Sequence, residues 1–494
     1  MSAAIRQWIR EYNRDAEVLL TDGKVVRCLV CEKDVSCKKK NHVDSHCNSA
    51  SHVAALCRLK KSKLKQQTIS STTAAADASA TLHRDLCEAF LCANIPMWKL
   101  ENPKLKSFLE TYTKKNIPNE STLRKNYVPK LFDETMAEVR RRVSGQYVYT
   151  VVDETTNERG EYVANLLLGV LTPHEARNPY LIASSILEKT NAATVGKFIN
   201  DSLMEFYRGE RFSARVLLLV TDAAPYMVSM GQNLHSIYTN LIHVTCVAHA
   251  LHRIAEKVRE SFPDVNHLIS WSRKVFLKSP ARASVYREIM KCALPPDVVV
   301  TRWGSWLTAA LFFANHFPKF CEVVSALKND SAHVQKLQVL LASKKKLGAD
   351  LAFINAHLAF LPAAITKLEE RGLSLNDQIT IIDEVRTKIY QIPGSRGSIF
   401  RKKTDFVFTK NGGYSQLHDL NESLLGEIGA STTSISDDPA VLSSYTYAPL
   451  VSVDVERSFS DYKIILTDRR MSFTQSNLEK YVVVMFNRRF FFTM

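Results

Sequence analysis

Four short apolar segments between residues 147 and 224 constrain the fold of this chain more than any other feature. They read YVYTVVDETT, YVANLLLGVL, YLIASSIL and ARVLLLVTDAA, and they are rich in β-branched residues. The last three are almost continuously apolar, which is typical of strands that are buried on both faces. The intervening and following segments TVGKFINDSLMEFY and APYMVSMGQNLHSIY have the apolar spacing of amphipathic helices. We therefore expect an α/β fold in which helices cover a sheet.

Two regions precede these strands in the chain. Residues 66–82 lack a periodic apolar face and have the composition of a linker. Apolar spacing returns over 83–142, where Leu86, Phe90 and Leu91 share one helical face. The stretch IPMWKLENP interrupts this pattern with two prolines, and a second helix is expected to run from about Asn119 to Arg142.

Three further regions make up the rest of the chain. The strand-rich core is expected over 143–258, and a largely helical insertion over 259–450. Within that insertion, IPGSRGS, KNGGY and ASTTSISDDP make 391–450 loop-rich. The last region, 451–494, contains an amphipathic helical pattern over about 453–487.

Residues 1–65 carry a metal-binding pattern. Cys28-Leu-Val-Cys31 is followed by three histidines. A tight CxxC turn places two thiolates on one side of an ion, and two imidazoles from a following helix complete a tetrahedral zinc site. The spacing C-x2-C-x14-H-x5-H assigns the ligands as Cys28, Cys31, His46 and His52, with His42 and Cys47 as alternatives. Chance occurrence in a basic tail is the competing explanation, and the near-standard spacing argues against it.

The chain is basic, with 65 Lys and Arg residues against 50 Asp and Glu residues and a formal net charge of +15. The first 70 residues hold 14 Lys and Arg but only 7 Asp and Glu. Such an excess predicts a polyanionic partner, and nucleic acid is the leading class. The pattern shows neither a signal peptide nor a run of about 18 apolar residues, so we expect no secretion and no membrane partner. Lysines that flank the zinc pattern are expected to contact phosphate, or to form a solvated face or a nuclear import signal: Lys38, Lys39, Lys40, Lys60 and Lys61.

Two aspartates follow the apolar cores of the first and fourth strand segments. Asp153 closes YVYTVVD and Asp222 closes RVLLLVTD. Carboxylates at the carboxyl ends of buried strands project into the crevice where α/β folds build their sites. Two such groups repel one another unless a cation such as Mg²⁺ lies between them. A single aspartate at such a position is more often a turn former or a helix cap, so the pair carries the prediction.

Five motifs occur in order along the chain: VVDETTNERGEYVANLLLGVL, LLLVTDAAPYM, HVTCVAHALHRI, TRWGSWL and VDVERSFSDYKIILTDRRMS. Together they resemble the hAT superfamily of DNA transposases, and the resemblance covers nearly the whole chain. The zinc pattern resembles the BED-type fingers found at the start of such transposases. The stretch VDSHCNSASHVAAL also resembles the corresponding part of CGG-repeat-binding proteins, which derive from transposases.

The resemblance implies an RNase H-like catalytic core, interrupted by an all-helical insertion and preceded by a BED-type zinc finger. It implies a triad of Asp153, Asp222 and Glu456 that would bind Mg or Mn. Asp454 and Glu154 are neighbouring alternative carboxylates. Glu456 would lie on a helix whose buried stripe is Val455, Phe459 and Leu466.

Two further motifs of the family have counterparts in this chain. The CxxH motif matches Cys246 and His249, which implies that His249 lies beside the scissile phosphate. The RW motif matches Arg302 and Trp303, which implies that an unpaired base stacks on Trp303. On the residues alone, a core cysteine, a helix-start histidine and packing tryptophans at 303 and 306 explain the same positions.

The resemblance predicts a nuclear transposase that binds transposon terminal repeats and target DNA and performs metal-dependent strand cleavage and transfer. It also predicts a homo-oligomer, in which the apolar run YVVVMFN contributes to the dimer, although that run equally fits the last core helix of one subunit. At 494 residues the chain is short for the family, which predicts a reduced helical insertion. The alternative is a domesticated, catalytically inactive DNA-binding regulator that keeps the fold.

Overall fold

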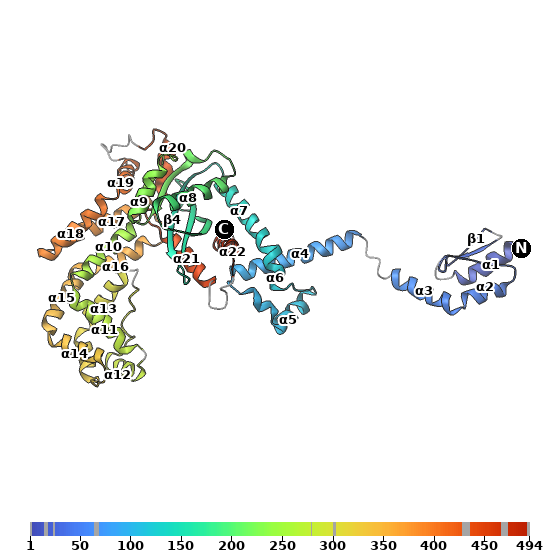
Figure 1. The fold of residues 1–494 in the computed structure, drawn as a ribbon, viewed down its shortest axis with the longest axis horizontal. Helices are drawn as coiled ribbons and strands as arrows, with labels where there is room; N and C mark the ends of the chain where they lie inside the picture. Colours follow the sequence, from blue (N-terminus) through green and yellow to red (C-terminus); the bar gives the residue numbers. More distant parts are fainter. Residues whose placement is uncertain are drawn as a thin grey trace. The chain divides into compact units, whose positions relative to one another are not determined.

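The computed structural model describes residues 2–13, 18–22, 25–63, 69–277, 279–299, 303–426, 435–465 and 473–491. The chain divides into two compact units, of which Figure 1 shows the helices and strands. The first unit comprises Met1–Asp85 with Glu110–Asn116. The second comprises Leu86–Leu109 with Ile117–Met494.

The first unit contains a small antiparallel sheet flanked by helices. Its elements are α1 (Ser2–Tyr12), β1 (Leu19–Thr21), β2 (Val26–Cys28), β3 (Lys33–Val35), α2 (Lys40–Cys47) and α3 (Ala50–Lys63), and the strands pair in the order β1-β2-β3. Its core is small and centres on Leu19, Val26 and Val43, which are fully buried. An apolar core of this size rarely stabilises so short a segment without a metal ion or disulfides.

Helices connect the small sheet to the larger core. They are α4 (Ile69–Cys92), η1 (Met97–Glu101), α5 (Pro103–Thr113), α6 (Glu120–Thr122), η2 (Leu123–Tyr127) and α7 (Val128–Val143). The helix predicted from Asn119 is confirmed, and the Asn119 side chain caps it by accepting a 2.8 Å hydrogen bond from the Thr122 amide. The linker predicted over 66–82 is wrong for 69–82, which belong to α4. Alanine favours helix, and no glycine or proline interrupts TTAAADASAT.

A five-stranded mixed sheet forms the centre of the second unit. Its strands are β4 (Tyr147–Thr156), β5 (Tyr162–Leu171), β6 (Tyr180–Leu187), β7 (Val216–Thr221) and β8 (Ile242–Thr245), arranged in the order β6-β5-β4-β7-β8. β5 runs antiparallel to β4 and β6, whereas β7 runs parallel to β4 and β8. The four predicted strands and the α/β class are confirmed, and most strand residues are buried. β8 was not predicted as a strand.

An asparagine side chain occupies each outer edge of this sheet. On the β6 edge, Asn487 accepts from the Leu181 amide at 2.9 Å and donates to the Leu181 carbonyl at 2.8 Å. On the β8 edge, Asn411 does the same with Thr245, at 3.1 and 2.6 Å. Each primary amide thus replaces one residue of a missing strand, which satisfies buried backbone groups and blocks edge pairing at that point.

The helices that pack against the sheet include α8 (Ala192–Tyr207), α9 (Pro225–Leu234), α21 (Val453–Ile465) and α22 (Gln475–Arg488). The short helix η3 (Ser213–Arg215) precedes β7, and α10 (Val247–Glu260) follows β8 and packs on helices of the insertion. In the sheet, α21 packs on β4 and β5, whereas α22 packs on β6. Figure 1 shows α21 and α22 in red beside the green strands.

The C-terminal helix α22 belongs to the core of its own chain. Every residue of YVVVMFN is at most 7% exposed, so the run is the last core helix and not an exposed dimer surface. Arg488, which follows it, forms a buried ion pair with Glu88 at 2.5 Å and donates to the Thr135 hydroxyl at 2.8 Å. α22 therefore joins the sheet to α4 and α7.

The segment between α10 and α21 is helical, as predicted. It contains α11 (Pro263–Phe276), α12 (Pro280–Met290), α13 (Trp303–Ala326), α14 (Ala332–Ala342), α15 (Lys344–Leu358), α16 (Phe360–Leu368), α17 (Leu375–Tyr390), α18 (Gly394–Thr409), α19 (Gly412–Leu424), α20 (Pro439–Ser444) and η4 (Tyr445–Tyr447). Among the described residues no single helix has the length and apolarity to cross a membrane, although the bent pair α15 and α16 passes by length and composition alone.

The loops predicted over 391–450 are wrong for most of that range, where α18, α19 and α20 lie. The glycines that suggested loops stand at helix starts instead. At Gly413 a Cβ atom would lie 2.0 Å from the carbonyl oxygen of His243, so glycine allows α19 to approach β8. The glycine pattern therefore marked close packing.

Candidate zinc site and candidate carboxylate site

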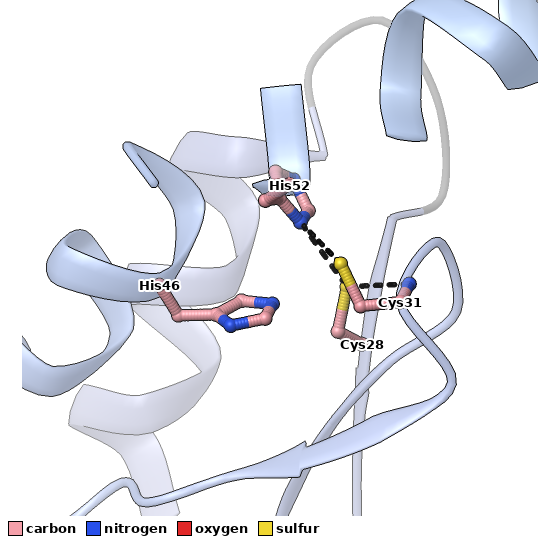
Figure 2. Close-up of side chains that lie close together, drawn as sticks. All are labelled: Cys28, Cys31, His46 and His52. Carbon is pink, nitrogen blue, oxygen red and sulfur yellow. Dashed lines mark hydrogen bonds between the residues drawn. The ribbon is translucent and has the colours of Figure 1, made fainter. Parts of the chain in front are cut away.

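Four elements of the first unit place the predicted zinc ligands together. Cys28 ends β2, Cys31 lies in the following turn, His46 lies on α2 and His52 on α3. The His52 Nδ1 atom is 3.4 Å from Cys28 Sγ and 3.3 Å from Cys31 Sγ, and the two imidazole centroids are 4.9 Å apart. Figure 2 shows the four side chains pointing toward one another. One ligand atom from each lies within 4.8 Å of the others, so the group could hold a metal ion.

The chemistry of this group fits zinc. The Nε2 atom of His46 is buried and has no hydrogen-bond partner, which leaves a lone pair for a metal. Burial, and then His46, lower the pKa of His52, which favours the neutral imidazole that zinc requires. Burial, and then Cys28, raise the pKa of Cys31, because two thiolates side by side repel without a cation. The Cys31 amide also donates to Cys28 Sγ at 3.4 Å and holds the turn.

The two alternative ligands lie outside this group. His42 is exposed, and its Nδ1 atom lies 3.2 Å from the Ser36 hydroxyl. Cys47 is buried in the small core, where burial, followed by Cys28, raises its pKa to about 11. Within the described residues, neither belongs to the set whose ligand atoms lie within 4.8 Å.

The residues predicted to contact DNA lie on several different elements, and one of them lies outside the described residues. Lys38, Lys39 and Lys40 are exposed at the start of α2, and Lys40 forms a 2.8 Å ion pair with Glu11. Lys60 and Lys61 lie in α3. Trp303 is the first residue of α13, while Arg302 and Leu466 lie outside the described residues. Trp306 is 1% exposed, as expected of a packing residue.

The second candidate site lies at the carboxyl ends of β4, β7 and β8. Asp153 lies within β4, which continues to Thr156, and Asp222 directly follows β7. The parallel strand β8 leads into α10, which carries His249. Glu456 lies on α21, where Val455 and Phe459 are buried as predicted. The sheet thus gathers residues that are up to 303 positions apart, from Asp153 to Glu456.

The carboxylates of this site repel one another. Burial raises the pKa of Asp153 well above its usual range; nearby His249 opposes the shift, and Asp222 adds to it. Burial, followed by the charge of Asp222, raises the pKa of Glu154 to about 7. Tyr226 on α9 donates a short hydrogen bond to Glu154 Oε1, while Glu154 Oε2 is buried and has no hydrogen-bond partner. A cation would relieve both the repulsion and the unsatisfied oxygen.

His249 supplies a positive charge at the same site. Burial lowers its pKa, but Cys246, Asp153 and Glu456 together outweigh burial and raise that pKa to about 10. Burial raises the pKa of Cys246, but His249 and Ser452 together outweigh burial, and the net shift of that pKa is downward. The His249 Nε2 atom lies 3.6 Å from Glu456 Oε1. This environment favours the protonated form of His249 beside the Glu456 side chain.

Ser452 contacts both Cys246 and His249 and holds them in position. Its amide donates to Cys246 Sγ at 3.2 Å, and its hydroxyl lies 3.4 Å from His249 Nδ1. Ser452 is fully buried just before α21. Sequence reasoning missed both Ser452 and Tyr226, although each lies inside or beside a quoted motif, because their roles depend on partners from other elements.

The site offers three carboxyl groups, which are the oxygen ligands that divalent cations such as Mg²⁺ take. Among the described residues, Asp153, Asp222 and Glu456 do not form a group whose ligand atoms all lie within 4.8 Å. The alternative carboxylate Asp454 is bound at 2.8 Å by Arg371 and at 2.7 Å by Arg457, which makes it a poorer ligand.

Comparison with known proteins relates one segment of the chain to a known family. Residues 73–130 match the family model of the CGGBP1 helical domain, so this segment, from α4 to α7, is related to that domain. No curated protein matches the chain.

Proposed function

We propose that this chain is a DNA transposase of hAT type, which binds DNA through its N-terminal finger and cleaves it at the carboxylate site. The observation that carries the proposal is the convergence of Asp153, Asp222, His249 and Glu456 at one edge of the sheet. Buried carboxylates beside a fixed cation are typical of functional sites, since burial of like charges is unfavourable unless a ligand uses them.

Each residue of the site has a distinct role in this proposal. Asp153, Asp222 and Glu456 would hold Mg or Mn, which supplies activation of water and stabilisation of the leaving oxygen in phosphoryl transfer. His249 is held between Ser452 and Glu456 with a positive charge, and would bind the scissile phosphate. Cys246 sustains that charge from within the core.

The architecture supports the remaining parts of the proposal. The mixed sheet is compatible with an RNase H-like core, and the helices from α11 to α19 enter between β8 and α21 as an insertion. The first unit is compatible with a BED-type finger whose zinc ligands are Cys28, Cys31, His46 and His52. We assign the lysines of α2 and α3 to phosphate contacts, with transposon ends and target DNA as partners, the nucleus as compartment and a homo-oligomer as the active form.

Strand cleavage tests this function. The purified zinc-loaded chain is incubated with the DNA that flanks its own gene and with Mg²⁺ or Mn²⁺. Cleavage that is lost in Asp153→Asn and in Glu456→Gln would support the proposal. Specific binding without cleavage under either metal would reject it.

A DNA-binding regulator without catalytic activity is the second candidate. The match of residues 73–130 to the CGGBP1 helical domain favours this candidate. The CGG-repeat-binding proteins, which the finger region also resembles, derive from transposases. In that case zinc removal by a chelator should abolish sequence-specific binding, and Asp153→Asn should leave both binding and any regulatory readout unchanged. Binding that survives chelation would reject a role for the finger in either candidate.

A further inference from the structure

We propose that a cavity in the helical insertion binds an amphipathic organic anion, that is, a small molecule with an apolar body and a carboxylate or sulfonate group. The cavity measures about 860 Å³ and is lined by residues of α10, α11, α13 and 294–298. This volume lies in the range of cavities that hold small organic ligands. The residues of the carboxylate site and of the zinc site are not among those that line the cavity, so this inference does not rest on the proposed function.

One face of α11 forms a wall of the cavity. Four of its residues line the cavity at intervals of three or four positions: Asn266, Ile269, Arg273 and Phe276. This spacing places their side chains on one face of the helix. Residues 294–298 follow α12, form neither helix nor strand, and add a second wall that contains two prolines. Because proline has no N–H group, the hydrogen-bond donors of the cavity come mainly from side chains.

The side chains around the cavity are largely apolar. Ile269, Phe276 and Trp306 are at most 6% exposed, whereas Leu277, which also lines the cavity, is 56% exposed. A ligand with an apolar body would remove Leu277 and the cavity walls from water, which is favourable in proportion to the apolar area that is buried. Protein–DNA interfaces are more polar than such a surface, which favours a small apolar ligand over a DNA strand.

Donors dominate the hydrogen-bonding groups of the cavity. Arg259, Arg273 and Lys274 are positively charged, and none of these side chains can accept a hydrogen bond. Asp297 is the acidic residue among the described residues that line the cavity, and Arg273 Nε already binds its Oδ1 atom at 3.0 Å. Three cationic side chains against one carboxylate leave a positive excess, which complements an anionic head group.

Trp306 adds a further donor to the cavity wall. This residue is 1% exposed, and its Nε1 atom is buried and has no hydrogen-bond partner. A buried N–H group without an acceptor is unfavourable, and an oxygen of a bound anion would satisfy it. Trp303, to which the resemblance assigns an unpaired base, is not among the residues that line the cavity. The cavity is therefore distinct from that expected base contact.

Fluorescence of anilinonaphthalene sulfonate, an apolar anion that emits strongly in apolar surroundings, tests this inference on the zinc-loaded full chain. Ser270 lines the cavity from α11, and Ser270→Trp should fill part of the space and weaken dye binding by about 10-fold or more. Ser325→Trp is the matched control, since Ser325 is exposed on α13 and, like Ser270, donates its hydroxyl hydrogen bond to a carbonyl of its own helix. This control should bind the dye as the parent does.

Two competitors test the charge preference of the cavity. Octanoate and octanol have the same alkyl chain, but only octanoate is ionised at neutral pH. In the parent, octanoate should displace the dye at about 10-fold lower concentration than octanol, as expected of one charge-assisted hydrogen bond. This preference should fall to about 2-fold or less in Arg273→Gln/Lys274→Gln. Lys319→Gln/Lys328→Gln, which neutralises two exposed lysines elsewhere in the insertion, should retain it.

Three outcomes would overturn the inference. They are equal dye binding in Ser270→Trp and the parent, equal displacement by octanoate and octanol, and displacement by a single-stranded oligonucleotide at lower concentration than octanoate. The last result would assign the cavity to DNA. Circular dichroism melts verify folding, and Leu277→Glu, at an exposed position that would repel an anion, replaces Ser270→Trp if the latter does not fold.

Discussion

Single residues of the carboxylate site are held in place at a cost to stability, and Glu154 shows it best. The pKa of a glutamate carboxyl group is ordinarily 4.5, and the folded chain raises that of Glu154 to about 7. Between these values the folded chain binds more protons than the unfolded chain, so the free energy of unfolding falls as pH rises through this window. Glu154→Gln removes the titration. In the absence of divalent cations, the variant should therefore be more stable than the parent near pH 8.

Urea unfolding at two pH values checks this expectation. The advantage of Glu154→Gln should shrink toward zero near pH 4.5, where the stability lost by ionising Glu154 is restored. An advantage of equal size at both pH values would contradict the assigned pKa.

The four candidate zinc ligands, which the structure brings together, could be predicted from the sequence because a CxxC turn and two histidines on adjacent helices form a local pattern. Cys31→Ser should reduce bound zinc from about one ion per chain to nearly none, since three remaining ligands leave the tetrahedral site open. Cys57→Ser is the matched control, because Cys57 is an exposed cysteine of α3. Zinc content is measured by atomic emission. Equal zinc loss in both variants, or none in Cys31→Ser, would exclude the assignment.

Ser452 and Tyr226 were beyond sequence reasoning for a physical reason. Ser452 contacts residues that lie 203 and 206 positions away, and Tyr226 contacts Glu154 at a distance of 72 positions. No spacing rule reports such pairs. Only the sheet order, which places β4 beside β7, brings Tyr226 to Glu154.

At the scale of elements, the four longer strands of the sheet could be predicted from the sequence, whereas the short outer strand β8 could not. Long buried strands can be predicted because they are continuous apolar runs in the sequence. The strand β8 has only the four residues IHVT, and this short sequence could equally be the start of the helix that follows it, α10. The glycines at the starts of α18 and α19 resembled loop signals because local patterns do not reveal close packing against another element. Alanine-rich 69–82 had no apolar face, yet its helix propensity prevailed.

The asparagines that occupy the sheet edges give a prediction at this scale. Asn487→Ala should lower the free energy of unfolding by about 1–3 kcal/mol, because the buried amide and carbonyl of Leu181 lose their partners. Asn233→Ala is the control, since Asn233 is exposed on α9 and should change stability by no more than about 0.5 kcal/mol. Chemical denaturation of both variants provides the comparison. An equal effect of the two substitutions would refute the edge role of Asn487.

At the scale of the whole molecule, the two units should respond differently to loss of metal. The first unit has a small core and is expected to need zinc for its stability, whereas the second has an extensive buried core. A chelator should therefore remove amide protection from β1 to α3 and leave β4 to β7 protected. Hydrogen exchange followed by mass spectrometry measures this directly. Loss of protection in both units would show that they fold together.

The central claim is that three carboxylates from distant segments form one site for divalent cations. Iron-directed cleavage of the polypeptide tests it, since Fe²⁺ in a Mg²⁺ site generates radicals that cut the backbone nearby. With ascorbate and peroxide, we expect cuts close to Asp153, Asp222 and Glu456 in the same sample. Excess Mg²⁺ or Asp222→Asn should suppress all three. Cuts confined to the zinc ligands of the first unit, or no cut at the three carboxylates, would contradict the claim.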